Sequence, residues 1–186
     1  VIVLMVGVAS GWPLLRAAAL DDEIGVAART LAVDRAAEVA IGRLEALRDT
    51  AADRARRALA DPSDPTLVAP IAWADTELDV AVSVWRGDSL VTWSGPVPGP
   101  ERVGPAAVPL VVDYGFRRYL VVQAFDDDGV RAACDVALGV SEDLFPRLGL
   151  GLTPGARVAP EYGVAIRLWP SPPVDEDLAP GAVLRG

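Results

Sequence analysis

The reactive side chains of this chain are few, and their types exclude most nucleophilic catalysis. Its 186 residues include no histidine, and each of the 17 basic residues is an arginine. A Ser-His, Cys-His or Ser-Lys pair is therefore impossible. Cys134, the single cysteine, shares an alternating apolar run with Ala132 and Val136, which favours a place in the core. We expect no catalytic residue in this chain and no enzyme activity.

Carboxylates offer the remaining chemistry, but their spacing is typical of turns and solvated helix faces. Asp126-Asp127-Asp128-Gly129 contains oxygen ligands, yet the twelfth position of a calcium loop requires a glutamate and is here Ala137. Arg86-Gly87-Asp88-Ser89 matches the integrin-binding tetrapeptide but has the composition of a hairpin turn. No glycine-rich phosphate loop is present. We therefore expect no metal and no cofactor, and a net charge of −9 argues against nucleic acid as a partner.

A first hairpin places polar and aromatic residues where a small ligand could bind. If Gly87-Asp88 is its two-residue turn, strand pairing gives one apolar face, which we expect to be core. That face comprises Val80, Val82, Val84, Val91 and Trp93. The opposite face combines short polar groups with one aromatic ring, which suits a small polar ligand. Its residues are Asp79, Ser83, Trp85 and Thr92.

A second hairpin follows, and an even-length turn at 126–129 would sort its residues in the same way. One side would then hold Tyr119, Val121 and Phe125 with Ala132, Cys134 and Val136, leaving Arg131 and Asp135 on the other. Arg117 and Arg118 precede this hairpin, and a guanidinium can hold a carboxylate through two parallel hydrogen bonds. We expect these two arginines to bind a ligand carboxylate. The alternative is that all of these groups form a solvated sheet face.

The hairpins must be positioned by a scaffold, and its largest part is a helix predicted over 20–61. This stretch lacks proline until Pro62, begins with acidic residues and ends with arginines, as the helix dipole favours. A predicted apolar stripe comprises Leu20, Ile24, Leu31, Ile41, Leu44, Ala51, Ala55 and Ala58. Such a helix would be about 60 Å long. Because a small domain cannot cover that length, we expect either a homodimer along the helix or a break at Gly25 or Gly42.

Period-two alternation predicts strands at 78–85, 90–94, 119–125, 130–140 and 162–169, with a proline-rich loop over 95–109 and a short helical turn at 141–144. Hairpins dominate, and no helix is placed to cross between parallel strands. We therefore predict an α+β fold, in which the long N-terminal helix packs on an antiparallel sheet of about five strands. The sheet domain would span 67–169, followed by a proline-rich tail over 170–186.

The N-terminal segment, 1–19, begins with fifteen uncharged residues. We expect it to be the outer end of a truncated membrane anchor, since a full span needs about 20 apolar residues. A cleaved signal peptide ending near Ala17-Ala18-Ala19 and a buried core helix are the alternatives. Either of the first two interpretations places the rest of the chain outside the cytoplasm.

The order of elements, with VAVSVWRGDSLVTWSG and then FRRYLVVQAFDDDGVRAACDVALGVSEDLF, resembles the extracytoplasmic sensor regions of bacterial membrane-bound histidine kinases of the Cache or PAS-like type. The resemblance covers roughly residues 20–169. It implies a periplasmic or extracellular sensor domain of a two-component system, which binds a small ligand and relays a shift through the N-terminal helix. A non-enzymatic envelope protein that binds another protein is the alternative function.

Overall fold

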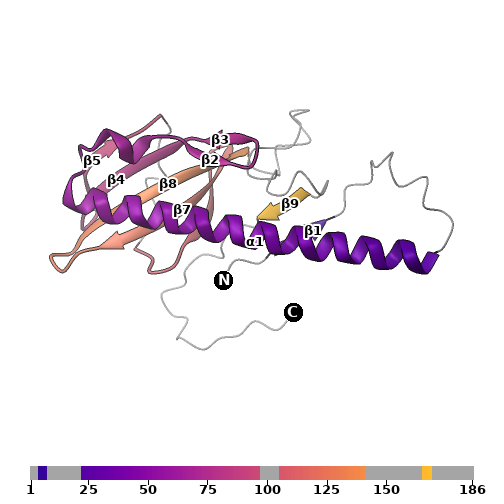
Figure 1. The fold of residues 1–186 in the computed structure, drawn as a ribbon. Coiled ribbons are helices and arrows are strands. Elements are labelled where there is room, and N and C mark those ends of the chain that lie inside the picture. Colours follow the sequence, from indigo (N-terminus) through magenta and orange to yellow (C-terminus); the bar gives the residue numbers. More distant parts are fainter. Residues whose placement is uncertain (1–3, 8–21, 97–104, 141–164, 169–186) are drawn as a thin grey trace.

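The computed structural model describes residues 4–7, 22–96, 105–140 and 165–168, and their arrangement is α+β (Figure 1). Within these ranges a single α-helix packs against antiparallel sheet. The helical elements are α1 (Asp22–Ala60) and the short 3-10 helix η2 (Pro65–Val68). The strands are β1 (Leu4–Gly7), β2 (Ile71–Trp73), β3 (Thr76–Leu78), β4 (Val80–Arg86), β5 (Ser89–Ser94), β6 (Leu110–Tyr114), β7 (Arg117–Phe125), β8 (Val130–Val140) and β9 (Ala165–Leu168).

The main sheet has five antiparallel strands in the order β5-β4-β8-β7-β6. Two further two-stranded sheets pair β2 with β3 and β1 with β9. The predicted strand at 162–169 is therefore wrong as a member of the five-stranded sheet, because β9 pairs with Leu4–Gly7 instead. The fifth place belongs to β6, which the sequence analysis did not assign. It directly follows Pro109 and is only five residues long, so its alternation is hard to recognise.

Helix α1 approaches the sheet through a seam of small side chains. Ala40, Ala51, Ala55 and Ala58 are fully buried there, with Leu44 and Leu47 between them. These positions are spaced three or four residues apart, which keeps them on one side of a helix. The strands that α1 contacts most are β7 and β8, the second of which is the central strand. We call the buried helix residues Ala40, Leu44, Leu47, Ala51, Ala55 and Ala58 the alanine seam.

Two residues of the predicted stripe point away from the sheet. The side chains of Leu31 and Ile41 are 57% and 48% exposed. Ile41 follows the buried Ala40 by one residue, and one step along an α-helix turns the side chain by about 100°. Figure 1 shows that α1 lies along the sheet at its C-terminal end and continues beyond the sheet toward its N-terminus. That extension carries Leu31 on its surface.

The C-terminal end of α1 is tied to the chain that follows it. The Arg54 guanidinium donates hydrogen bonds to the carbonyl oxygens of Leu67, at 3.1 Å, and Ala69. Arg57 donates to the Asp64 carboxylate and to the Thr66 hydroxyl oxygen, each at 2.5 Å. Hydrogen bonds from Thr66, and then from Arg57, lower the pKa of Asp64. Burial lowers the pKa of Arg54, because its charged guanidinium is partly removed from water.

The main core lies between α1, the sheet and the β2–β3 hairpin. Its members include Trp73, Leu67, Leu78 and Leu120, and valines from β4, β7 and β8 fill the space around the alanine seam. Cys134 is fully buried here, as predicted, and burial raises the pKa of its thiol to about 12. The thiol is therefore inert at neutral pH.

Of the predicted N-terminal segment, only Leu4–Gly7 is described, and it forms β1. In the part of the chain that the structure describes, no helix is both long and apolar enough to cross a membrane. The helical turn predicted at 141–144 and the tail at 170–186 lie outside the described residues.

Because the seam consists of small side chains, a larger residue there should force α1 off the sheet. We expect Ala55→Leu to lower the free energy of unfolding by about 1–3 kcal/mol, as overpacking does in a filled core. Urea denaturation monitored by circular dichroism measures the change. Ala60→Leu, at an exposed position of the last turn, should change it by less than about 0.5 kcal/mol. Equal effects of the two variants would contradict the seam.

Candidate functional site

The first hairpin carries a β-bulge that alters which residues share a face. Arg86 pairs with Ser89 and Trp85 with Leu90, as a two-residue turn requires, but Val84 pairs with Thr92. Val91 is therefore an extra residue in β5. In β5, each side chain after Val91 therefore lies on the side of the sheet opposite to the predicted one. Thr92 lies on the side of Val84, toward α1, and Trp93 pairs with Ser83 on the opposite face.

The bulge overturns three predictions. Thr92 does not join Ser83 and Trp85, so the predicted polar face loses one member. Val91 and Trp93, predicted to be core, are 59% and 46% exposed. Val80, Val82 and Val84 are buried in the main core as predicted.

The turn of the second hairpin has an odd number of residues, whereas the prediction assumed an even number. Asp126 pairs with Val130 around a three-residue loop, in which Gly129 has a φ of +75° and so adopts a conformation that favours glycine. The Asp126 N–H donates to the Val130 carbonyl at 3.0 Å, and the Val130 N–H donates to the Asp126 carboxylate at 2.7 Å. This aspartate therefore serves the turn, as the sequence indicated. Phe125 consequently pairs with Arg131.

That register corrects the predicted sorting of β7 against β8. Val122 pairs with Cys134, whereas Val121 pairs with Asp135. Tyr119, Val121 and Phe125 thus share a face with Arg131 and Asp135, not with Cys134. We call the side of the five-stranded sheet that carries Ser83, Asp135 and these residues the distal face, because it is turned away from α1.

The distal face is buried around its centre and contains a small polar cluster. The Trp85 indole N–H donates to the Ser83 hydroxyl at 2.9 Å, and the Arg131 guanidinium lies over the Trp85 ring, 5.2 Å from its centroid. Ser83 and Arg131 are both buried. The Ala106 N–H donates to the side-chain oxygen of Gln123 on the same face, at 2.8 Å. Two predicted ligand residues, Ser83 and Trp85, therefore meet, but they are engaged with each other and with Arg131.

Asp135 is the unusual member of this cluster. It lies on the central strand with 2% of its surface exposed, and its Oδ1 atom accepts no hydrogen bond. Burial raises the pKa of the carboxyl to about 7, and Arg131 opposes the rise only in part. Burial also raises the pKa of Tyr119, with a further contribution from Asp135. The carboxyl is therefore partly protonated near neutral pH.

The predicted carboxylate-binding arginines are paired within the chain. Arg118 is buried and holds Asp113 through two hydrogen bonds, of 2.7 Å from Nε and 2.8 Å from a terminal nitrogen. Arg117 lies 4.0 Å from the carboxylate of Asp79 and over the ring of Phe116. The two-pronged contact that the sequence suggested exists, but its carboxylate is Asp113. Arg117, Arg118 and Asp79 are therefore not brought together with Ser83 and Trp85.

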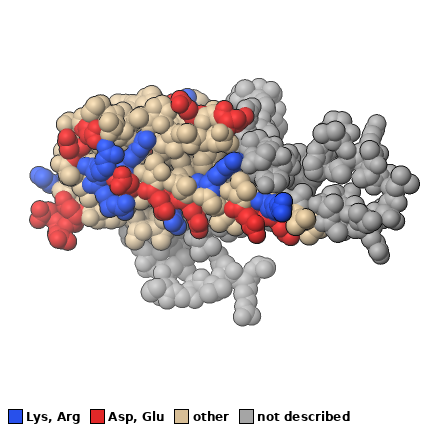
Figure 2. All heavy atoms as spheres, viewed as in Figure 1, with Lys and Arg blue, Asp and Glu red and all other residues tan. Residues whose placement is uncertain are grey.

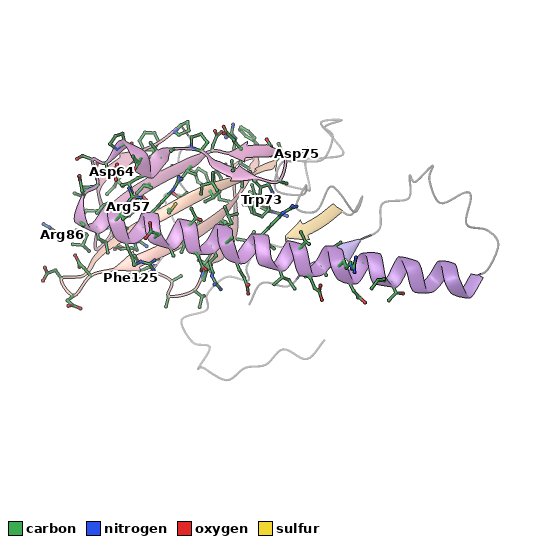
Figure 3. All side chains as sticks on the ribbon, viewed as in Figure 1. Arg57, Asp64, Trp73, Asp75, Arg86 and Phe125 are labelled. Atoms are coloured by element: carbon green, nitrogen blue, oxygen red, sulfur yellow. The ribbon has the colours of Figure 1, made fainter. Side chains whose placement is uncertain are left out.

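A cavity on the other side of the sheet was missed from the sequence. It has a volume of about 210 Å³ and lies between α1 and the β2–β3 hairpin. Helix α1 contributes Arg43, Leu47 and Thr50 to its lining, and the hairpin contributes Ile71, Trp73 and Ala74. Figure 3 shows Trp73 between the hairpin and α1, with Asp75 at the hairpin turn. The sequence analysis assigned no strand to residues 71–77, in which Ala74-Asp75 separates β2 from β3.

Two features of the cavity wall are unusual. The Trp73 indole nitrogen is buried and has no hydrogen-bond partner, although an unpaired buried donor costs about 1–3 kcal/mol. Ala74 has a φ of +50°, which is the left-handed region that an alanine adopts at a cost of about 1–2 kcal/mol. Strain and unpaired polar groups of this kind gather at functional sites.

Comparison with known proteins identifies no relative: no protein-family model, no curated protein and no solved structure matches this chain. Among the described residues, no group of three His, Cys, Asp or Glu side chains lies close enough to hold a metal ion. The buried acid of the distal face and the cavity beside α1 are thus the two candidate sites.

The buried carboxyl of Asp135 should make the stability of the protein depend on pH. Its pKa is about 7 in the folded chain against 3.8 in an open chain, so its ionisation opposes folding. The contribution is absent below about pH 4, and stability falls as the pH rises toward 7, by up to about 4 kcal/mol. Asp135→Asn should therefore be more stable than the parent at pH 8 but not at pH 4, as measured by urea denaturation. A difference that does not change with pH would contradict the assignment.

The Arg118–Asp113 ion pair should contribute more to the free energy of unfolding than an exposed ion pair between the same residue types. We expect Asp113→Ala to lower the free energy of unfolding by about 1–3 kcal/mol, because it leaves a buried guanidinium without its carboxylate. The matched control is Asp49→Ala, which removes the 2.8 Å partner of Arg48 on the surface of α1 and should cost less than about 1 kcal/mol. Thermal and urea denaturation of both variants provide the comparison.

Proposed function

We propose that this chain is the extracytoplasmic sensor domain of a membrane-bound receptor of the histidine kinase type, similar to Cache or PAS-like sensors. It binds a small ligand without chemical conversion and relays binding through α1. The observation that carries the proposal is that one helix supplies the alanine seam of the core, lines the cavity and continues beyond the sheet. A ligand in the cavity therefore contacts the element that leaves the domain.

The proposed relay follows from the rigidity of this helix. Helix α1 has 39 residues and so is about 58 Å long. Because packed interfaces shift between discrete arrangements and do not deform smoothly, a change at Leu47 or Thr50 is transmitted along the whole helix. The N-terminal segment, in this proposal, carries the shift to the membrane, with the sheet domain outside the cytoplasm.

The surface of α1 suits packing against the same helix of a second chain. On the side drawn in Figure 2, acidic side chains and arginines alternate along the helix. Asp53, for example, lies 3.8 Å from Arg56 and 3.9 Å from Arg57. Leu31 and Ile41 interrupt this polar surface. We propose a homodimer in which these two residues face the partner helix.

Distance measurements between spin labels test both the relay and the dimer. Labels at Glu38→Cys in α1 and Asp88→Cys at the β4–β5 turn occupy exposed sites, and the buried Cys134 stays unlabelled. A compound that raises the melting temperature, found by screening amino acids, organic acids and nucleobases, should change the distance between labels within one chain. The Glu38→Cys label alone should report a second chain. Stabilisation without any change in distance would refute the relay.

The second candidate is an envelope protein that binds another protein, and a specific observation favours it. Leu90, Val91 and Trp93 are all exposed on β5, which is an edge strand of the main sheet. Edge strands with exposed apolar side chains can pair with another chain. The gene distinguishes the two candidates: a kinase, cyclase or methyl-accepting region encoded after Gly186 supports sensing, and a stop codon there supports the envelope protein.

A further inference from the structure

Strand β5 is an edge of the main sheet that carries apolar side chains on its surface. Within the described residues it pairs with β4 alone. Leu90, Val91 and Trp93 are 49%, 59% and 46% exposed. The strand contains no charged residue and no proline, which are the usual means of preventing an edge strand from pairing. The outer side of β5 can therefore accept a further strand.

The opposite edge, β6, has those protections. Pro109 directly precedes it, and Asp113 places a charge on the strand, where Arg118 holds it in a two-pronged contact. The first two residues of β6, Leu110 and Val111, are buried. Of the two edges, β5 is therefore the one that suits pairing with another chain.

The bulge gives β5 an odd number of positions that can pair. Its residues pair with β4 except for Val91, which is the extra one. The paired residues are, in order, Ser89, Leu90, Thr92, Trp93 and Ser94. Paired residues of an antiparallel ladder point to the same side of the sheet, and the sides alternate along a strand. A strand with an odd number of positions can therefore pair over its whole length with a second copy of itself. With an even number, every residue would meet one from the opposite side.

The residues at these positions form a nearly symmetric pattern, with hydroxyl side chains at the two ends and at the centre. In a full-length antiparallel pair, Thr92 would lie opposite its own copy, and Ser89 opposite Ser94 of the second copy. Leu90 would lie opposite Trp93 of the second copy. Hydroxyl pairs can share hydrogen bonds across strands, and the leucine and tryptophan would bury apolar surface against each other. The pattern of β5 is therefore complementary to itself.

The bulge also places the two large apolar side chains on one side of the sheet. Leu90 and Trp93 both lie on the distal face, because they pair with Trp85 and Ser83. In a regular strand, residues 90 and 93 would point to opposite sides. Pairing between two β5 strands would thus cover the exposed apolar side chains of both chains on the same face.

We propose that β5 pairs with the β5 strand of a second copy of this chain, so that the two main sheets join into one, with Thr92 on the two-fold axis. Chains of net charge −9 repel each other, but an uncharged strand sets no like charges opposite one another. Because the axis is perpendicular to the sheet, both α1 helices lie on one side of the joined sheet and run in opposite directions. This contact is therefore distinct from a dimer along Leu31 and Ile41, and it does not depend on the sensor function.

Sedimentation velocity of the whole 186-residue chain, at protein concentrations up to about 1 mM, tests the association. A pair of short strands belongs to the small, transient interfaces, so we expect a reversible equilibrium between monomer and dimer. Val91→Lys brings positive charges together beside the two-fold axis and should weaken the association at least about tenfold. The matched control, Leu31→Lys, makes the same kind of change at a 57% exposed site of α1 and should leave the association unchanged. Circular dichroism confirms that both variants are folded.

Cysteine cross-linking tests the register without a change of charge. Thr92→Cys should form a disulfide with its own copy under mild oxidation, since paired Cα atoms lie about 4.5–5.5 Å apart. Ser94→Cys alone should not, because its own copy would lie four positions away, at about 14 Å. A mixture of Ser94→Cys and Ser89→Cys chains should cross-link. The buried thiol of Cys134 does not compete.

Three results would overturn the proposal: a chain that stays monomeric up to about 1 mM, an association that Val91→Lys does not weaken, and a Thr92→Cys variant that cross-links no faster than Ser94→Cys. The failure of the sensor function is a separate measurement. It would appear as an unchanged distance between the labels at Glu38→Cys and Asp88→Cys within one chain when a stabilising compound is added, whatever the state of β5.

Discussion

The close approach of α1 to the central strands is the constraint on which the rest of the structure depends. It requires small side chains on the helix, and alanines occupy most of the buried seam. The bulk of the core then has to come from the other elements. Valines of β4 and β8 supply it beneath the helix, and Trp73 and Leu78 supply it at the flank, where the β2–β3 hairpin closes the core. The cavity lies where this flanking hairpin meets the helix, so its shape also depends on the seam.

Burial on both faces of the sheet decides how its polar groups behave. Arg118 lies deep in the protein but meets Asp113 in a two-pronged contact, so its charge is compensated. The Trp85 indole N–H is satisfied by the Ser83 hydroxyl oxygen, which accepts its hydrogen bond. Asp135 has one oxygen without a partner, and the protein accommodates it by making the carboxyl harder to ionise. The sheet therefore shows three outcomes of one rule: a buried polar group forms an ion pair, forms a hydrogen bond with a neutral partner, or becomes harder to ionise.

The sequence predicted the fold class and the local elements better than the site. The helix follows from proline-free sequence with charges that suit its dipole, and β4, β7 and β8 follow from alternation. The sorting of residues onto faces failed for two reasons. Val91 is an extra residue in the first hairpin, and the turn of the second hairpin has three residues where an even number was assumed. A register shift of one residue moves a side chain to the other face of the sheet. No pattern in a single sequence marks Val91 as a bulge. The cavity was missed because three-residue strands such as β2 and β3 are too short for periodicity to reveal them.

The strand order also determines how this chain can fold. The pairing at the centre of the sheet joins β4 to β8, residues 80–86 to residues 130–136, while every other pairing in that sheet is between neighbours in the chain. Each hairpin closes a short loop, which costs little chain entropy. The β4–β8 pairing closes a long loop, so the chain loses more entropy before the contacts between these strands stabilise it. Until β4 pairs with β8, the β4–β5 hairpin and the β6–β7–β8 unit each contain only part of the core residues. Helix α1 contacts β4 as well as β7 and β8, so it joins the two halves across their boundary. We expect the domain to gain its stability in one late cooperative step, with the joining of the two halves as the slow event.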